Sequence, residues 1–267
     1  MPKRKYSPSA LTTFLESPRR YHYRYILGLE PLVLTQQGYG HDLRWGTVWA
    51  SFVERFYNRV PEKENRAATA DEWLAAIDQI QWLPSGEKVQ LQYSEALLKL
   101  VDLYYSRYSP DDGVRLKSEL YLENDFLYGT LDGLGEGNII HECKGTKRAK
   151  SLDAQHKKYL FSIQTKCYAV LTQAKGIRIE LAFKDAPYDI LRYDTVDVTA
   201  EMLAQWEREL RDLCSGIDQM ESFPCHPQGC AIVSPRFVSE CEWQPLCDGQ
   251  ISESDIPLFY KRRTNNR

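Results

Sequence analysis

Three side chains in the middle of the chain have the types and spacing of a divalent-metal site. Asp132 follows an apolar segment, and Glu142 and Lys144 lie two residues apart on a segment that begins with two isoleucines. Residues two apart on a β-strand share a face, and a tight turn at 135–138 would bring Asp132 across from Glu142. Neighbouring carboxylates repel unless a cation lies between them. The pattern therefore predicts a site for Mg²⁺ or Mn²⁺, which prefer oxygen ligands.

A metal ion in this position would support chemistry on a phosphate. It would lower the pKa of a bound water and polarise a phosphate oxygen. Lys144 would position or deprotonate that water, or stabilise charge that develops on phosphorus. The main-chain carbonyl of Cys143 is a natural further ligand. The alternative interpretation is a surface pair of Glu142 and Lys144, with Asp132 as a turn residue. The apolar start of the Glu142 segment argues against it, because a solvated edge strand would be more polar.

The elements around these residues predict a central β-sheet. From Val114 to Glu123, apolar and polar residues alternate with a period of two, which indicates a strand. Two further strands are expected over 126–134 and 138–144, joined by the turn sequence GEGN. The later part of the chain predicts a long helix, two strands and a last helix, over 153–174, 177–183, 190–196 and 199–220.

The N-terminal part predicts helices. Ser7-Pro8 is a typical helix start, a second helix over 45–59 carries an apolar stripe, and 32–44 is expected to form a loop. Further helices are expected over 71–80 and 93–108. The predicted class is α/β, with a central mixed sheet flanked by helices. We expect one integrated domain made of a helical N-terminal region, a core and a cysteine-rich segment, over 1–110, 111–222 and 223–260.

The order of motifs resembles one branch of a known family. G-x-x-D-G, I-I-x-E-x-K and Q-x-x-x-Y follow one another, and the opening segment SPSALTTFLESPRRYHYRYI also fits. From about residue 6 to about 247 the chain resembles the RecB-like branch of the PD-(D/E)XK nucleases. The resemblance implies a restriction-endonuclease-like core, with Asp132 and Glu142 as metal ligands and Lys144 as the catalytic lysine. It implies that Gln164 and Tyr168 support the site or contact the DNA backbone.

The resemblance adds one acid and shows one departure. Glu119, on the strand before Asp132, matches an acid often found near the site in this branch. The family usually has a metal-binding His in a G-x-x-H setting on an early helix, and here Trp49 stands in that place. His41 lies nearby, in the predicted loop. We expect Trp49 to belong to the core, the alternative being that it stacks on a base.

Four of the seven cysteines cluster near the C-terminus and predict a metal site. In an intracellular protein such clustering indicates a metal or iron–sulfur site rather than disulfides. The resemblance implies a [4Fe–4S] cluster, with Ser17 where the family has a first-helix Cys, so that the ligands would be Cys225, Cys230, Cys241 and Cys247. Zn²⁺ or no metal are the alternatives. The other three, Cys143, Cys167 and Cys214, are expected to be small buried residues.

Charge and composition limit the classes of protein to consider. The net charge of −3 argues against a generic nucleic-acid coating protein, although basic residues cluster in the first 25 residues and in 144–158, where they could bind phosphates. No apolar run approaches the roughly 20 residues that span a bilayer, and no secretory signal is recognisable. We therefore expect a cytoplasmic protein of a prokaryotic or phage-infected cell, with no membrane partner.

The leading functional hypothesis is a metal-dependent DNA exonuclease that acts on ends or single strands. The first alternative is a nuclease-fold subunit that binds DNA or protein without cutting. The second is a nuclease that is active only with partner proteins of a recombination, repair or CRISPR-adaptation complex. The absence of a G-x-x-x-x-G-K-[ST] motif argues against a helicase driven by nucleoside triphosphates.

Overall fold

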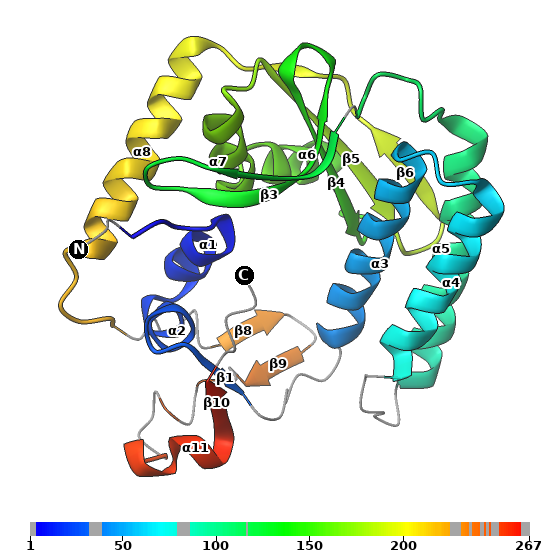
Figure 1. Cartoon of the computed structure of the whole chain (residues 1–267). Coiled ribbons are helices and arrows are strands. Elements are labelled where there is room, and N and C mark those ends of the chain that lie inside the picture. The colour runs from blue at the N-terminus through cyan, green and yellow to red at the C-terminus, as the bar shows by residue number, and fades with distance from the viewer. Residues whose placement is uncertain are drawn as a thin grey trace. The chain divides into compact units, whose positions relative to one another are not determined.

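The structure is a computed structural model, and it describes residues 4–31, 39–78, 86–115, 117–224, 231–234, 237–240, 243, 246 and 251–262. The chain forms two compact units, both of which hold helices and strands (Figure 1). Unit 1 comprises Met1–Lys5 and Gly38–Leu210, and unit 2 comprises Tyr6–Gln37 and Arg211–Arg267. The division into regions at 110 and 222 stays a prediction. Among the described helices, none has the length and apolar character needed to cross a membrane.

Unit 1 is built around a six-stranded mixed sheet. Its strands are β2 (Lys117–Glu123), β3 (Tyr128–Gly135), β4 (Ile139–Thr146), β5 (Gly176–Phe183), β6 (Asp189–Arg192) and β7 (Val196–Asp197). The order is β2-β3-β4-β5-β6, and β7 also pairs with β5. Only the β4–β5 pairing is parallel among these strands, because a helical crossover connects them. The predicted α/β class with a central mixed sheet is confirmed.

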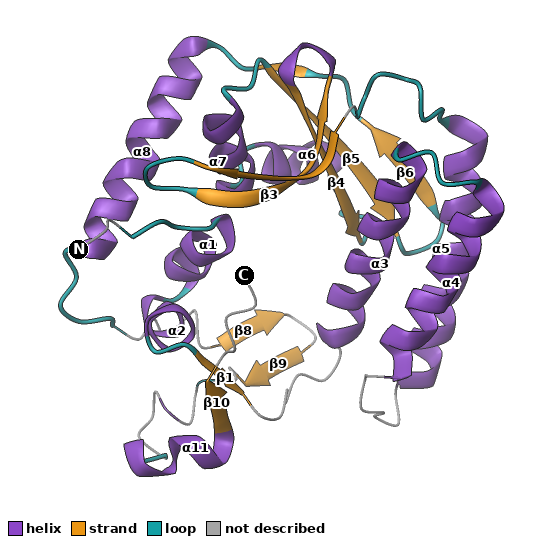
Figure 2. Ribbon diagram, viewed as in Figure 1, coloured by secondary structure: helices purple, strands orange, loops and turns teal. Residues whose placement is uncertain are grey.

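Helices cover both faces of this sheet (Figure 2). They are α3 (Tyr39–Tyr57), α4 (Glu62–Asp78), α5 (Gly86–Arg107), α6 (Leu152–Leu160), α7 (Ile163–Thr172) and α8 (Ala200–Asp218). Helix α3 packs on β4 and α5 on β6, whereas α4 packs beside α3 and α5, and α8 extends from unit 1 into unit 2. Helix α7 contacts β2, β3 and β4, and α6 contacts β5. The face of β4 that carries Cys143 meets α3, and the face that carries Lys144 meets α7.

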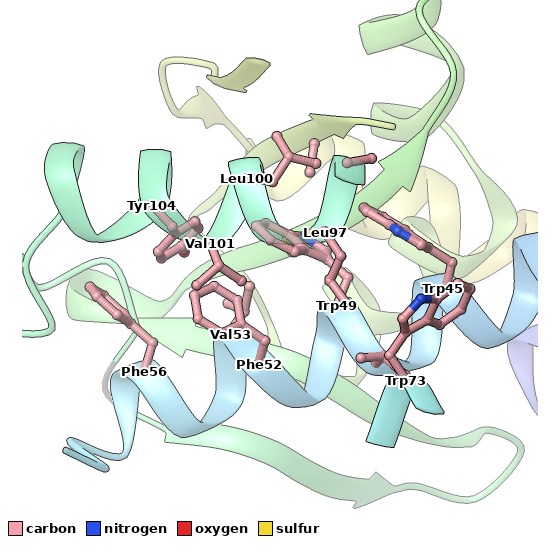
Figure 3. Close-up of a cluster of buried hydrophobic side chains, with 14 of the residues drawn as sticks. Trp45, Trp49, Phe52, Val53, Phe56, Trp73, Leu97, Leu100, Val101 and Tyr104 are labelled. Atoms are coloured by element: carbon pink, nitrogen blue, oxygen red, sulfur yellow. The ribbon is translucent and has the colours of Figure 1, made fainter. Parts of the chain in front are cut away.

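The core of unit 1 lies between α3, α4, α5 and the sheet (Figure 3). Buried side chains recur every three or four residues along α3, which is the spacing of a helix with one apolar face. They are Trp45, Val48, Trp49, Phe52, Val53 and Phe56. The rings of Trp45 and Trp49 stack with their centroids 5.8 Å apart. The expectation that Trp49 is a core residue is confirmed, since the side chain is fully buried.

Several expected helix boundaries were wrong. Helix α4 begins at Glu62 and not at 71, with two acids in its first turn, as suits a helix N-terminus. Helix α5 begins at Gly86 and not at 93. Helix α3 already begins at Tyr39, although glycines at 38 and 40 suggested a loop up to residue 44, so the backbone of His41 is helical. The long helix expected over 153–174 is two helices that break at Phe161 and Ser162. Ser162 starts α7 because its hydroxyl accepts a hydrogen bond from the backbone N–H of Thr165 (3.1 Å).

Local chemistry also shapes the connections of the sheet. The turn between β3 and β4 is a single 3₁₀ turn, η2 (Glu136–Asn138), in which Gly137 and Asn138 have positive φ angles of 68° and 66°. The Asn138 amide donates hydrogen bonds to the carbonyls of Thr172 and Gln173, so it caps the end of α7. The strand expected over 190–196 is interrupted, and its two parts are β6 and β7.

Unit 2 combines short helices with short strand pairs. Its elements are α1 (Pro8–Glu16), α2 (Pro18–Tyr21), the π-helix η1 (His22–Ile26), β1 (Leu29–Pro31), β8 (Ala231–Ser234), β9 (Phe237–Glu240), η3 (Glu253–Asp255), α11 (Ile256–Phe259) and β10 (Tyr260–Arg262). Strand β1 pairs with β10, and β8 with β9. The hydroxyls of Ser7 and Ser17 cap α1 and α2. A small core holds Tyr23, Trp243 and Tyr260 as stacked rings.

Candidate active site

Three acidic residues occupy one row across β2, β3 and β4. Pairing joins Ser118 to Gly133 and Leu120 to Leu131, so Glu119 lies opposite Asp132 without being paired with it. The β3–β4 pairing ends where Gly133 meets His141, and the next position in register places Asp132 opposite Glu142. Both neighbouring pairings are therefore interrupted at Asp132. An interrupted ladder frees backbone and side chains from pairing, and such interruptions are frequent next to active sites.

Lys144 lies between two of these acids. Its ammonium forms an ion pair with the Glu142 carboxylate and lies 3.9 Å from Oδ2 of Asp132. It also donates a hydrogen bond to Oε1 of Gln164 on α7 (3.3 Å). The structure thus brings Asp132, Glu142, Lys144 and Gln164 together on one face of the sheet, from two strands and one helix.

The Glu142 carboxylate is buried without adequate partners. Apart from the ion pair with Lys144, neither of its oxygens has a hydrogen-bond partner among the described residues, and the side chain is almost fully inaccessible. Burial raises the pKa of Glu142, and the nearby charge of Asp132 raises it further, whereas Lys144 opposes both, which leaves the pKa at about 7. Burial alone would lower the pKa of Lys144, but Glu142 and Asp132 outweigh it and raise that pKa, so the ammonium stays charged. The site holds two acids for one ammonium and attracts further positive charge.

Tyr168 lies one turn after Gln164 on α7 and connects the helix to β3. Its hydroxyl donates a hydrogen bond to the carbonyl of Thr130 (2.5 Å). Burial raises the pKa of Tyr168, and the charges of Glu142 and Asp132 add to this effect, so the phenol is a hydrogen-bond donor at neutral pH. The spacing of Gln164 and Tyr168 predicted that they share one face of the helix. Their contacts agree, because Gln164 contacts Lys144 and Tyr168 contacts β3.

Glu119 has an unusual backbone conformation. Its φ angle is 47°, in the left-handed region that side-chain-bearing residues rarely adopt. Partial burial raises its pKa, and the charge of Asp132 raises it further. Glu119 therefore interacts electrostatically with Asp132 and lies at one end of the row of three acids.

The donor atoms of the site fit a hard divalent cation. The buried Glu142 carboxylate and the partly buried Asp132 carboxylate are ligands that Mg²⁺ and Mn²⁺ prefer. Oδ2 of Asp132 also accepts a hydrogen bond from the backbone N–H of Cys143 (3.4 Å). Within the described residues, no three His, Cys, Asp or Glu side chains are close enough to form a metal site by themselves. A metal ion here would therefore need ligands beyond side chains, such as main-chain carbonyls, water or a substrate.

The opposite face of β4 carries a buried polar network that the sequence patterns did not reveal. Cys143 points to this face, where its Sγ contacts Nε1 of Trp49 (3.1 Å) and Oε1 of Glu180 (3.2 Å). Oε2 of Glu180 accepts a hydrogen bond from Nε of Arg192 (2.7 Å) and lies 3.6 Å from Nε2 of His141. His141 and Cys143 flank Glu142, so this network fixes the backbone that carries the acid.

Electrostatics make this network a fixed ion pair. Burial raises the pKa of Glu180, but His141 and Arg192 outweigh it and lower the pKa to about 2. Burial lowers the pKa of His141 itself, so at neutral pH the lasting counter-charge of Glu180 is Arg192. Arg192 also pairs with Asp112 (2.6 Å) and lies over the ring of Tyr108. The sequence holds one signal for this network, a glutamate in the middle of the apolar strand GIRIELAF, which the motif-based predictions did not use.

The seven cysteines divide into two groups. Cys143, Cys167 and Cys214 are buried and form no disulfide, as expected for small core residues. The four residues predicted to hold a [4Fe–4S] cluster lie outside the described residues, and they are Cys225, Cys230, Cys241 and Cys247.

Comparisons with known proteins show the family and the fold of the chain. The model of the PD-(D/E)XK nuclease superfamily matches residues 5–248. The crystal structure of a "putative exonuclease" from Eubacterium rectale is similar, with a TM-score of 0.52 and 12% identity over 94% of this chain and 89% of that chain. A phage-related exonuclease from Haemophilus somnus 129PT gives a TM-score of 0.34 and 15% identity over 64% of this chain and 92% of that chain. At these identities the first likeness shows the fold alone. No curated protein matches the chain.

Proposed function

Because the chain belongs to the PD-(D/E)XK nuclease superfamily, we propose that it is a Mg²⁺- or Mn²⁺-dependent deoxyribonuclease. In this proposal it is an exonuclease that hydrolyses phosphodiester bonds at DNA ends or in single strands. The observation that carries the proposal is the buried Glu142 carboxylate, which lies opposite Asp132 and shares with it the single ammonium of Lys144, so that two carboxylates face one cation. A buried carboxylate is costly unless a cation compensates its charge.

Each residue of the site has a proposed role. Asp132, Glu142 and the main-chain carbonyl of Cys143 would hold the divalent ion, which supplies an acidified water and a polarised phosphate oxygen. Lys144 is already charged, so its ammonium would stabilise the negative charge that develops on the phosphate and orient the attacking water.

The flanking residues would keep the ammonium in place. Gln164 accepts a hydrogen bond from Lys144 and would orient it toward the phosphate. Tyr168 anchors α7 to β3 through its hydroxyl, which keeps Gln164 at this distance. A charged Glu119 carboxylate would repel the phosphate of the substrate unless a cation or a proton neutralised it. We therefore assign Glu119 to the surroundings of the metal ion and not to the surface that contacts the DNA backbone.

The test of this proposal is digestion of matched DNA substrates. Linear and circular DNA, each single- and double-stranded, would be incubated with Mg²⁺, Mn²⁺ or EDTA, and released nucleotides measured. We expect release from linear DNA with either metal and none with EDTA. Lys144→Ala and Glu142→Gln should reduce the rate at least a hundredfold, because each removes transition-state or metal stabilisation. Lys99→Ala, an exposed lysine on α5, is the matched control. Equal rates for Lys144→Ala and the control would contradict the assigned site.

A second candidate is a nuclease-fold subunit that binds DNA or a partner protein of a recombination, repair or CRISPR-adaptation complex without cutting. The observation that favours it is Trp49, which fills the core where the resemblance places a metal-binding His. Binding of DNA in the absence of any metal-dependent release of nucleotides would support this alternative over the first.

A [4Fe–4S] cluster on the four C-terminal cysteines stays a separate proposal, with Zn²⁺ or no metal as its alternatives. It is supported by their clustering within 23 residues of the sequence. Anaerobically purified protein should absorb near 400 nm, and Cys241→Ser should abolish the absorbance. Colourless protein with a stoichiometric content of zinc would instead identify a zinc site.

A further inference from the structure

The segment that follows Lys144 in the chain is rich in basic residues. Residues 144–158 hold six basic residues and one acid, Asp153. Lys147, Lys150 and Lys158 are exposed, and within the described part of the chain none of them forms an ion pair. By contrast, Lys157 pairs with Asp153 (2.8 Å). Three positive charges are therefore left uncompensated along one short segment, which we call the lysine segment.

This segment is held in a defined shape by one buried glutamine. Nε2 of Gln155 donates to the carbonyl of Lys147 (2.7 Å) and to the hydroxyl of Thr146 (3.1 Å). Its Oε1 accepts a hydrogen bond from the backbone N–H of Ala149 (3.1 Å). Gln155 is only 7% exposed, so these bonds form away from competing water. The backbone that carries the lysines is thus preorganised before any ligand binds.

The same contacts connect the lysine segment to the site. Thr146 lies two residues beyond Lys144 on β4, hence on the same face and about 7 Å further along the strand. Its hydroxyl accepts a hydrogen bond from Tyr159 near the end of α6 (3.1 Å). Five residues later, Gln164 contacts Lys144 from α7. The α6–α7 turn is therefore anchored on both sides to the part of β4 that carries the site.

An exposed aromatic ring lies at this turn. Phe161 is the last residue before Ser162 starts α7, and 49% of its surface is exposed. Ring burial therefore does not explain a phenylalanine there. Exposed aromatic rings beside uncompensated positive charge are the features with which proteins bind unpaired nucleotides, because bases stack on the ring while phosphates meet the lysines. A base-paired duplex keeps its bases stacked on each other and offers no free face except at its ends.

We propose that Phe161 and the lysine segment form a subsite for single-stranded nucleic acid. A base stacks on Phe161, the phosphate next to it contacts Lys158, one turn earlier on α6, and a phosphate further along the strand contacts Lys150 just before the start of that helix. This inference rests on the proposed function, because that function requires the bound nucleic-acid strand to extend from the subsite to Lys144. It predicts that the active site binds single-stranded nucleic acid in preference to a duplex. Of the three lysines of the segment, Lys147 is the one closest in sequence to Lys144.

The test is binding in EDTA, where hydrolysis does not interfere. Fluorescence anisotropy would measure the affinity of the full chain for a labelled 15-nucleotide oligothymidine, the matching oligouridine and a blunt hairpin duplex. Phe161→Ala should weaken binding to the single strands by about 5- to 160-fold, the range of one base–aromatic stack, and leave duplex affinity unchanged. Leu98→Ala, which removes an exposed apolar side chain from α5, is the control and should change neither affinity.

The lysines are tested by the dependence of affinity on salt. For single strands, each phosphate contact contributes about −0.7 to the slope of log K against log salt concentration. The double variant Lys150→Ala/Lys158→Ala should therefore make the slope less negative by about 1.4, whereas Lys63→Ala/Lys99→Ala on α4 and α5 should not change it. Equal affinity for oligothymidine and oligouridine would assign the subsite to both nucleic acids.

The outcomes separate the subsite from the nuclease proposal. Wild-type affinity of Phe161→Ala for single strands, or an unchanged salt slope in the lysine variant, would overturn the subsite even if the protein cleaves DNA. Single-strand binding that depends on Phe161, in a protein that releases no nucleotides with any metal, would support the subsite and refute the nuclease. Equal losses on the duplex and the single strands would also overturn the subsite, because stacking would not explain them.

Discussion

Replacing Glu180 by glutamine tests the buried network behind the site. Glutamine keeps the shape of the side chain but cannot ionise, so the change removes the charge that Arg192 neutralises at 2.7 Å. The pKa of Glu180 falls from 4.5 to about 2 in the folded protein. A difference of about 2.5 pKa units corresponds to about 3 kcal/mol at neutral pH. Breaking a buried ion pair generally lowers the free energy of unfolding by about 3 to 5 kcal/mol. We expect a loss at the low end of this range, because Arg192 retains Asp112 as a partner.

The pH dependence fixes the sign of this effect. A carboxyl group whose pKa is lower in the folded state stabilises the fold fully above its unfolded value of 4.5, and this contribution disappears as the pH falls through 2. The variant has no such contribution. The difference in free energy of unfolding between the wild type and Glu180→Gln should therefore shrink from about 3 kcal/mol at pH 7 to about 1 kcal/mol at pH 3.

The assay is urea unfolding followed by tryptophan fluorescence at pH 7, 5 and 3. Glu64→Gln, an exposed acid on α4, serves as the control and should match the wild type at each pH. A destabilisation of the same size at pH 3 and pH 7 would mean that the lost packing, not the charge, matters. No destabilisation at pH 7 would refute the assignment of Glu180 and Arg192 as a stabilising pair.

Three further changes test the packing around the site. Trp49→Ala should lower the free energy of unfolding by about 3 to 5 kcal/mol, because it leaves a large cavity under β4, and a smaller loss in urea unfolding would contradict a tightly packed core there. Gly145→Ala should lower the free energy of unfolding by about 1 to 3 kcal/mol, because the new methyl group would collide with the ring of Trp45. Thermal unfolding would measure this loss, and Gly216→Ala, whose methyl group would contact nothing, should be neutral or stabilising in the same experiment. Tyr168→Phe removes one hydrogen bond to β3 and should cost about 1 kcal/mol, while an unchanged melting temperature would show that the bond has no net effect.

Much of the fold was determined by patterns that act locally. Alternation and turn residues predicted the strands around Asp132 and Glu142, and the apolar stripe predicted that Trp49 is buried. These predictions succeeded because side-chain periodicity is set by the geometry of the strand or helix itself. Local signals failed at boundaries. Apolar periodicity continued through Ser162, although its hydroxyl starts a new helix there.

The sequence by itself determined the family, the mixed α/β class and the face that Glu142 shares with Lys144, because these depend on motif order and on spacing along one strand. Only the tertiary structure decided that Glu142 is buried with Lys144 as its partner and that Gln164 reaches Lys144 from α7. It also decided that Glu180 meets Arg192 behind the site. Burial and contacts between distant segments depend on how the elements pack, and spacing along the chain carries no information about that.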